Sequence, residues 1–93
     1  MTALLTQQEI DDALTRLDGW SQSGNEIART FVLPGFPAAL AFTCAAGHLA
    51  ERADHHPDIL IQYRKVTLTL STHSAGGLTQ KDIDLAGEIN AIA

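Results

Sequence analysis

Two stretches near the middle of the chain alternate apolar and polar residues so regularly that they predict adjacent β-strands. The stretches are residues 59–64 and 66–71. Their apolar sides are formed by Ile59, Ile61 and Tyr63, then by Val66, Leu68 and Leu70. The turn falls at Arg64-Lys65, a connection so short that it permits only an antiparallel hairpin. The helices of the chain are therefore expected to pack against the apolar face of this hairpin.

The sequence on either side of the hairpin predicts two further strands and three helices. The predicted elements are a helix that stops at Gly19, strands at 20–22 and 26–33, a helix at 37–53, and a last helix after Thr79. Thr6 and Glu9 form a capping box at the first helix, and Pro37 suits the first turn of the second. The order αββαββα predicts an α+β domain, with a four-stranded antiparallel sheet and helices packed on its apolar face.

The core of such a domain is modest in size. The chain has 93 residues, of which 45% are hydrophobic, so we expect one domain spanning 1–93. We expect Trp20, Tyr63 and the single cysteine, Cys44, to pack inside, together with Ile92 of the last helix. Self-association is a natural way for so small a chain to bury more surface, and a homodimer or homotetramer is therefore expected.

Charge and hydropathy exclude several classes of partner. The net charge of −5 argues against a nucleic acid or an anionic membrane as the main partner. No segment reaches the ~20 apolar residues of a membrane span. The N-terminal residues lack the basic and then apolar pattern of a signal peptide. A lone cysteine is compatible with a reducing compartment, and a cytoplasmic location is expected.

Three of the four histidines, His55, His56 and His73, lie close together in the sequence beside several acids. Imidazole has an unperturbed pKa of about 6.5, so it both gives and takes protons near neutrality. Adjacent histidines rarely bind one metal ion, and the chain has neither a His-x-x-x-His pair nor paired cysteines. Ser71 and Ser74 flank His73 without a nucleophile elbow, and no glycine-rich phosphate loop is present. These observations favour acid–base chemistry without a metal or cofactor.

The same region resembles the pterin-4a-carbinolamine dehydratase family, also known as dimerisation cofactors of a homeodomain transcription factor. The shared pattern is an acid, three residues, His-His-Pro, an aromatic residue, a histidine ten residues after it and an aspartate nine further on. It is met by Glu51, His55, His56, Pro57, Tyr63, His73 and Asp82. Residues 17–20, 66–73 and 77–79 are also similar to the family, so the resemblance spans nearly the whole chain.

The resemblance implies dehydration of 4a-hydroxytetrahydropterin to quinonoid dihydropterin, which recycles the pterin cofactor of aromatic amino acid hydroxylases. The catalytic set that it implies is His55, His56, His73 and Asp82. We assign proton transfer to His55 and His73, binding or polarisation of the pterin to His56, and orientation of an imidazole to Asp82. The substrate contacts that it implies are His55, His56, Pro57, Thr72, His73, Ser74 and Ala75, with Glu51 and Asp54 in supporting positions.

Structural interpretations of the same residues stay open at this point. His55 and His56 also suit a helix end, and Asp82 also suits the first helical turn three residues after Thr79. Some family members have an aromatic residue at position 59 and a Glu-Cys pair at 74–75, which affects the shape of the pocket rather than the acid–base groups. A non-catalytic alternative is a module that stabilises the oligomer of a partner, such as a hydroxylase or a regulator, through the apolar segment 36–49.

Overall fold

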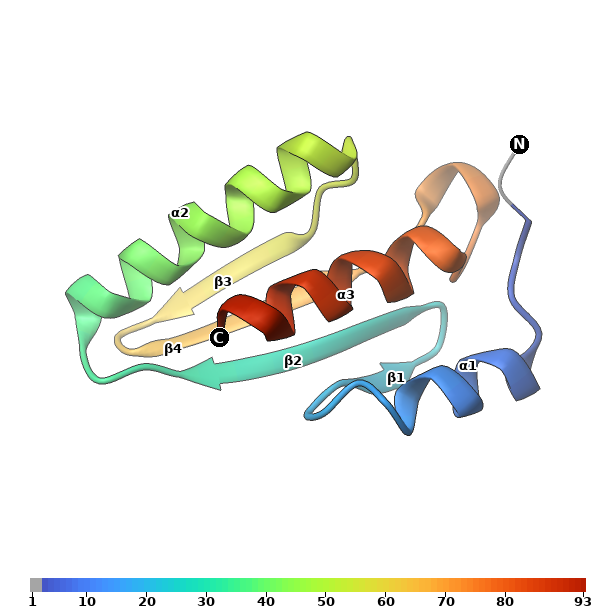
Figure 1. Ribbon diagram of the computed structural model, residues 1–93, viewed down its shortest axis with the longest axis horizontal. Coiled ribbons are helices and arrows are strands. Elements are labelled where there is room, and N and C mark those ends of the chain that lie inside the picture. The colour runs from blue at the N-terminus through green and yellow to red at the C-terminus, as the bar shows by residue number, and fades with distance from the viewer. Residues whose placement is uncertain (1–2) are drawn as a thin grey trace.

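A four-stranded antiparallel sheet forms one layer of the molecule, and the two longer helices form the other (Figure 1). The computed structural model describes residues 3–93, so Met1 and Thr2, which belong to the segment tested for a signal peptide, lie outside the described residues. Within 3–93 the elements are α1 (Gln7–Leu14), β1 (Ser21–Ser23), β2 (Glu26–Val32), α2 (Phe36–Ala53), β3 (Asp58–Gln62), β4 (Lys65–Leu70), a short 3-10 helix η1 (His73–Ala75) and α3 (Gln80–Ile92). The predicted αββαββα order is confirmed.

The strands lie in the order β1-β2-β4-β3, and all neighbours are antiparallel. The predicted hairpin is present, but its turn lies one residue earlier than expected. Lys65 pairs with both Gln62 and Val32, so it belongs to β4, and the loop consists of Tyr63 and Arg64. Tyr63 has a φ of +56° and is 70% exposed, so the prediction that it packs against the sheet is wrong. The two-residue loop requires a left-handed residue there to match the strand twist, and this carries the side chain away from the core.

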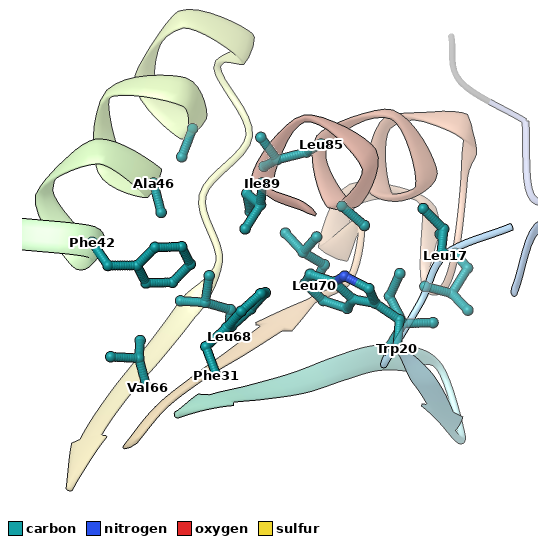
Figure 2. Packing of buried hydrophobic residues seen from close by; sticks show 14 of the residues in the cluster. Leu17, Trp20, Phe31, Phe42, Ala46, Val66, Leu68, Leu70, Leu85 and Ile89 are labelled. Carbon is teal, nitrogen blue, oxygen red and sulfur yellow. The ribbon is translucent and has the colours of Figure 1, made fainter. Parts of the chain in front are cut away.

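The core lies between the sheet and the helices α2 and α3, as Figure 2 shows. Its sheet side is formed by Ile27, Phe31, Val66, Leu68 and Leu70, and its helix side includes Phe42, Ala46, Leu85 and Ile89. Trp20 is 5% exposed and meets the ring of Phe31 edge-on, with 6.2 Å between the ring centroids, so its predicted place in the core is confirmed. The alanines of α2 allow the helix backbone to approach the sheet closely.

Two side chains that were expected inside are exposed. Cys44 lies on the outer side of α2, because Ala39, Phe42, Ala46 and Ala50 form the side that faces the core. Ile92, in the last turn of α3, is 43% exposed. Although α2 is apolar, neither it nor any other helix within residues 3–93 is long and apolar enough to cross a membrane.

The first helix is shorter than the sequence predicts. It begins at the capping box, where the Thr6 and Glu9 side chains bond to each other's backbone N–H. It ends at Leu14, after which tighter turns replace helical bonds, as when the Leu17 N–H donates to the Leu14 carbonyl. Leu17 is nevertheless buried. Gly19 has a φ of +83°, which strains any residue with a side chain, and a β-carbon there would displace the Arg29 guanidinium.

The end of α3 is tied to the first loop by Asn90. Its Oδ1 accepts a hydrogen bond from the Trp20 indole at 2.8 Å and another from Arg29 Nη1 at 2.8 Å. Its Nδ2 donates to the Asp18 carbonyl at 3.1 Å. Three segments that are distant in sequence therefore depend on one amide side chain.

Candidate active site

The end of α2 places His55. Asp54 adopts a left-handed conformation with a φ of +50°, and the His55 N–H donates to the Ala50 carbonyl at 3.0 Å. This pattern is a Schellman motif, which reverses the chain as soon as the helix stops. The His55 side chain is thereby turned inward and is 10% exposed, whereas the His56 side chain remains 59% exposed.

Asp82 is fully buried in the first turn of α3 and holds the His55 ring. Its Oδ1 lies 2.5 Å from His55 Nε2. Its Oδ2 accepts from Thr72 Oγ1 at 2.8 Å and from the Thr79 backbone N–H at 2.9 Å. A buried carboxylate is tolerable when it is fully hydrogen-bonded, and within residues 3–93 no buried side-chain nitrogen or oxygen lacks a partner. The two interpretations of Asp82 therefore hold together, because one oxygen caps the helix and the other binds the imidazole.

This arrangement determines which nitrogen of the His55 ring is free to bind a further proton. An ionised Asp82 carboxylate only accepts hydrogen bonds, and it therefore selects the neutral His55 tautomer that carries its proton on Nε2. The lone pair is then on Nδ1, which is the atom left for chemistry. When Nδ1 gains a proton, the adjacent Asp82 carboxylate stabilises the imidazolium through a charge-assisted hydrogen bond.

His73 comes from a different part of the fold. It begins η1, which connects β4 to α3. A hydrogen bond from the Thr72 N–H to the Gly77 carbonyl, at 2.9 Å, closes this connection. The His73 side chain is exposed, and the hydrogen bonds found among residues 3–93 include none from its ring. His56 differs, because its Nε2 lies 2.8 Å from Glu51 Oε1 in a solvent-exposed pair.

An open, polar hollow of about 400 Å³ lies between the loop after α2 and the connection from β4 to α3. Its lining residues are Asp54, His55, His56, Ser71, Thr72, His73, Ser74 and Lys81. All three histidines singled out by the sequence therefore line one hollow, although they come from two separate segments. Within residues 3–93, no group of three His, Cys, Asp or Glu side chains is arranged to hold a metal ion.

Comparison with known proteins identifies the family. Residues 3–92 match the protein family described as pterin 4 alpha carbinolamine dehydratase. The chain belongs to this family. A relative from Roseiflexus castenholzii, provisionally named a pterin-4-alpha-carbinolamine dehydratase, is 59% identical over 92 residues, covering 99% of each chain. One from Nocardia farcinica with the same provisional name is 54% identical, covering 99% of this chain and 97% of its own.

Solved structures of dehydratase relatives have the same fold. A crystal structure from Brucella melitensis, described as a transcriptional coactivator/pterin dehydratase, has a TM-score of 0.92 and 41% identity, covering 97% of this chain and 98% of that one. A pterin dehydratase-like protein identified as a RuBisCO assembly factor in the alpha-carboxysome has a TM-score of 0.65 and 21% identity, covering 80% and 86%. The second likeness concerns the fold alone.

The structure brings together most, but not all, of the residues that the dehydratase pattern implied. Pro57, Ala75 and Glu51 are not among the residues that line the hollow, and Tyr63 lies at the opposite end of β3 from His55. Ser71, which the sequence offered only as a nucleophile without an elbow, and Lys81, which the sequence did not single out, also line the hollow. The sequence signal for both residues was proximity. Ser71 precedes the proposed substrate contact Thr72, and Lys81 precedes Asp82 of the pattern.

Proposed function

We propose that this dehydratase-family protein converts 4a-hydroxytetrahydropterin to quinonoid dihydropterin and water by histidine acid–base catalysis. In this role it recycles the pterin cofactor of aromatic amino acid hydroxylases. Family membership supports the substrate class. The observation that carries the mechanism is the buried Asp82 bound to His55, beside a hollow that His56 and His73 also line.

The proposed reaction needs two proton transfers. The bond between carbon 4a and its hydroxyl oxygen breaks, and one imidazole gives the departing hydroxyl a proton so that it leaves as water. A second imidazole takes the proton from the adjacent ring nitrogen. The electron pair of that N–H bond then forms the carbon–nitrogen double bond of the quinonoid product. Substrate and product differ by one water molecule, and the protein needs no oxidant or reductant.

In this proposal His55 and His73 carry the two protons. His55 exchanges its proton at Nδ1, with Asp82 holding the ring and stabilising its charged form. His73 serves at the rim, where its ring is exposed to an incoming pterin. His56, held by Glu51, binds or polarises the pterin. Pro57, Ser74 and Ala75 remain predicted substrate contacts.

A dehydration assay on metal-stripped protein tests the function. The wild type is expected to accelerate loss of the 4a-hydroxyl group, followed by absorbance. His55→Ala and His73→Ala are each expected to lose about 10²–10⁴-fold of that acceleration while keeping the native circular dichroism spectrum. His48→Ala is the matched control, because His48 is an exposed histidine of α2 that does not line the hollow. A metal-stripped wild type that does not accelerate dehydration contradicts the proposal.

A non-catalytic binding module, the alternative raised by the sequence, is not favoured. Such a role requires the outer face of α2, where Phe36 and Leu40 are 47% and 42% exposed. It gives no reason for a buried carboxylate to hold a histidine at the edge of a polar hollow. The same exposed face supports the proposed homodimer or homotetramer, with the edge strand β3 as a second candidate surface.

A further inference from the structure

We propose that Thr72 is a positioning residue of the dehydration site, acting through Asp82 on His55. This inference rests on the proposed function and goes beyond it. The family resemblance implies Thr72 as a substrate contact. Thr72 lines the hollow, but its hydroxyl already has two buried partners, Asp82 and Thr79, and the residue is only 4% exposed.

The direction of these hydrogen bonds follows from their number. The Thr72 hydroxyl has one proton, which it donates to Asp82 Oδ2 at 2.8 Å. The 2.7 Å contact between Thr72 Oγ1 and Thr79 Oγ1 must therefore be donated by Thr79. Thr72 has no second proton to offer a substrate. Its hydroxyl is a fixed link from Thr79 to Asp82.

This link determines which carboxylate oxygen meets the imidazole. Asp82 Oδ2 receives two donors, the Thr72 hydroxyl and the Thr79 backbone N–H, so Oδ1 is left for His55 Nε2. Without the Thr72 hydroxyl, a single donor would hold Oδ2, and the carboxylate would be freer to rotate about its terminal torsion. The His55 ring would then lose the fixed partner that keeps its proton on Nε2 and its lone pair on Nδ1.

Thr72 also connects the two proposed proton carriers. Its carbonyl accepts from the Ala75 N–H at 3.0 Å and from the Gly76 N–H at 3.0 Å, which closes the turn that bears His73. Its side chain holds the carboxylate that bears His55. One residue therefore fixes both segments, and removal of the hydroxyl alone separates the side-chain effect from the backbone effect.

The test compares Thr72→Val, which deletes the hydroxyl at nearly the same shape, with Thr72→Ser, which keeps it. Thr72→Val is expected to lower kcat about tenfold or more with KM changed less than about twofold, because a hydrogen bond to a charged group is lost. Thr72→Ser should recover most of kcat. Thr67→Val is the control, since Thr67 bonds to Thr30 on the sheet, outside the hollow.

A second readout does not depend on activity. In ¹⁵N NMR of the imidazoles, wild type and Thr72→Ser are expected to show neutral His55 protonated on Nε2, while Thr72→Val shows a mixture of tautomers. A wild type without dehydratase activity defeats the proposed function, yet the tautomer comparison still tests the positioning role. If Thr72→Val does not fold, the comparison of Thr72→Ser with Thr72→Ala replaces it.

Any one of three results would overturn the inference. One is a hydroxyl-free variant with wild-type kcat and an unchanged His55 tautomer. Another is a variant that raises KM with kcat unchanged, which would make Thr72 a direct substrate contact. If Thr72→Ser loses as much kcat as Thr72→Val, the hydroxyl, which serine keeps, is not the group that positions Asp82.

Discussion

Replacing Asp82 with asparagine keeps the size and shape of the side chain but exchanges one acceptor oxygen for an NH₂ donor. The surroundings decide how the amide must lie. The Thr79 backbone N–H can only donate, so the amide oxygen has to occupy the place of Oδ2, where the Thr72 hydroxyl also donates. The NH₂ group then faces His55 Nε2, which must accept. The imidazole proton is forced onto Nδ1.

The size of the effect follows from this switch of tautomer. With Nδ1 protonated and no carboxylate beside Nε2, the neutral ring has no lone pair at Nδ1 and its imidazolium form loses an anionic partner. A general acid–base group contributes about 10²–10⁴-fold, and a mismatched histidine tautomer costs up to about 10⁴-fold. We expect Asp82→Asn to lower kcat by about 10²–10⁴-fold, equivalent to about 3–5 kcal/mol of transition-state stabilisation.

The assay is dehydration of 4a-hydroxytetrahydropterin under saturating substrate, together with ¹⁵N NMR of the imidazoles and thermal unfolding. Asp84→Asn is the matched control. Asp84 is an exposed carboxylate of the same helix, bonded to Gln80. It should keep kcat within about threefold of the wild type. A folded Asp82→Asn protein with a kcat in that same range, or with His55 still protonated on Nε2, would show that Asp82 does not set the His55 tautomer.

Three further predictions concern assembly and stability. Leu40→Asp, on the exposed face of α2, places a charge in the proposed apolar interface. The variant is expected to keep its fold, and light scattering is expected to give the mass of a monomer. An unchanged oligomer would exclude that face as the interface. Asn90→Ala is expected to lower the free energy of unfolding in urea by about 1–3 kcal/mol, since the Trp20 indole loses its acceptor; an unchanged midpoint would show that the tie is dispensable. Tyr63→Gly is expected to raise the free energy of unfolding by about 0.5–1 kcal/mol, because a non-glycine residue at positive φ is strained. Arg64→Gly is expected to lower it. Equal effects at the two sites would show that Tyr63 is not strained.

Local patterns in the sequence are enough to predict the arrangement of elements. The alternation around Val66 and Leu68, and the capping box at Thr6, each depend on residues that are near one another in the chain. The errors arise where the outcome depends on tertiary placement. Cys44 lies in an apolar helix, but only packing decides which side of that helix faces the sheet.

The sequence predicts which residues belong to the candidate site, but it does not predict the hydrogen bonds that join them. The residue types and close spacing of His55, His56 and His73 are sufficient to indicate proton transfer. The pairing of His55 with Asp82 joins positions 27 residues apart, and no local pattern reports it. The role of the Thr72 hydroxyl depends on three segments meeting in the interior, which the sequence alone does not describe.

A crystal structure of the protein with a bound pterin would show whether the three histidines meet around one substrate. We predict that the bicyclic ring lies in the hollow, with the edge that carries carbon 4a and its adjacent nitrogen within about 3.2 Å of His55 Nδ1 and of a ring nitrogen of His73. A pterin bound elsewhere on the molecule, or a His55 ring whose Nδ1 faces the protein interior, would contradict this prediction.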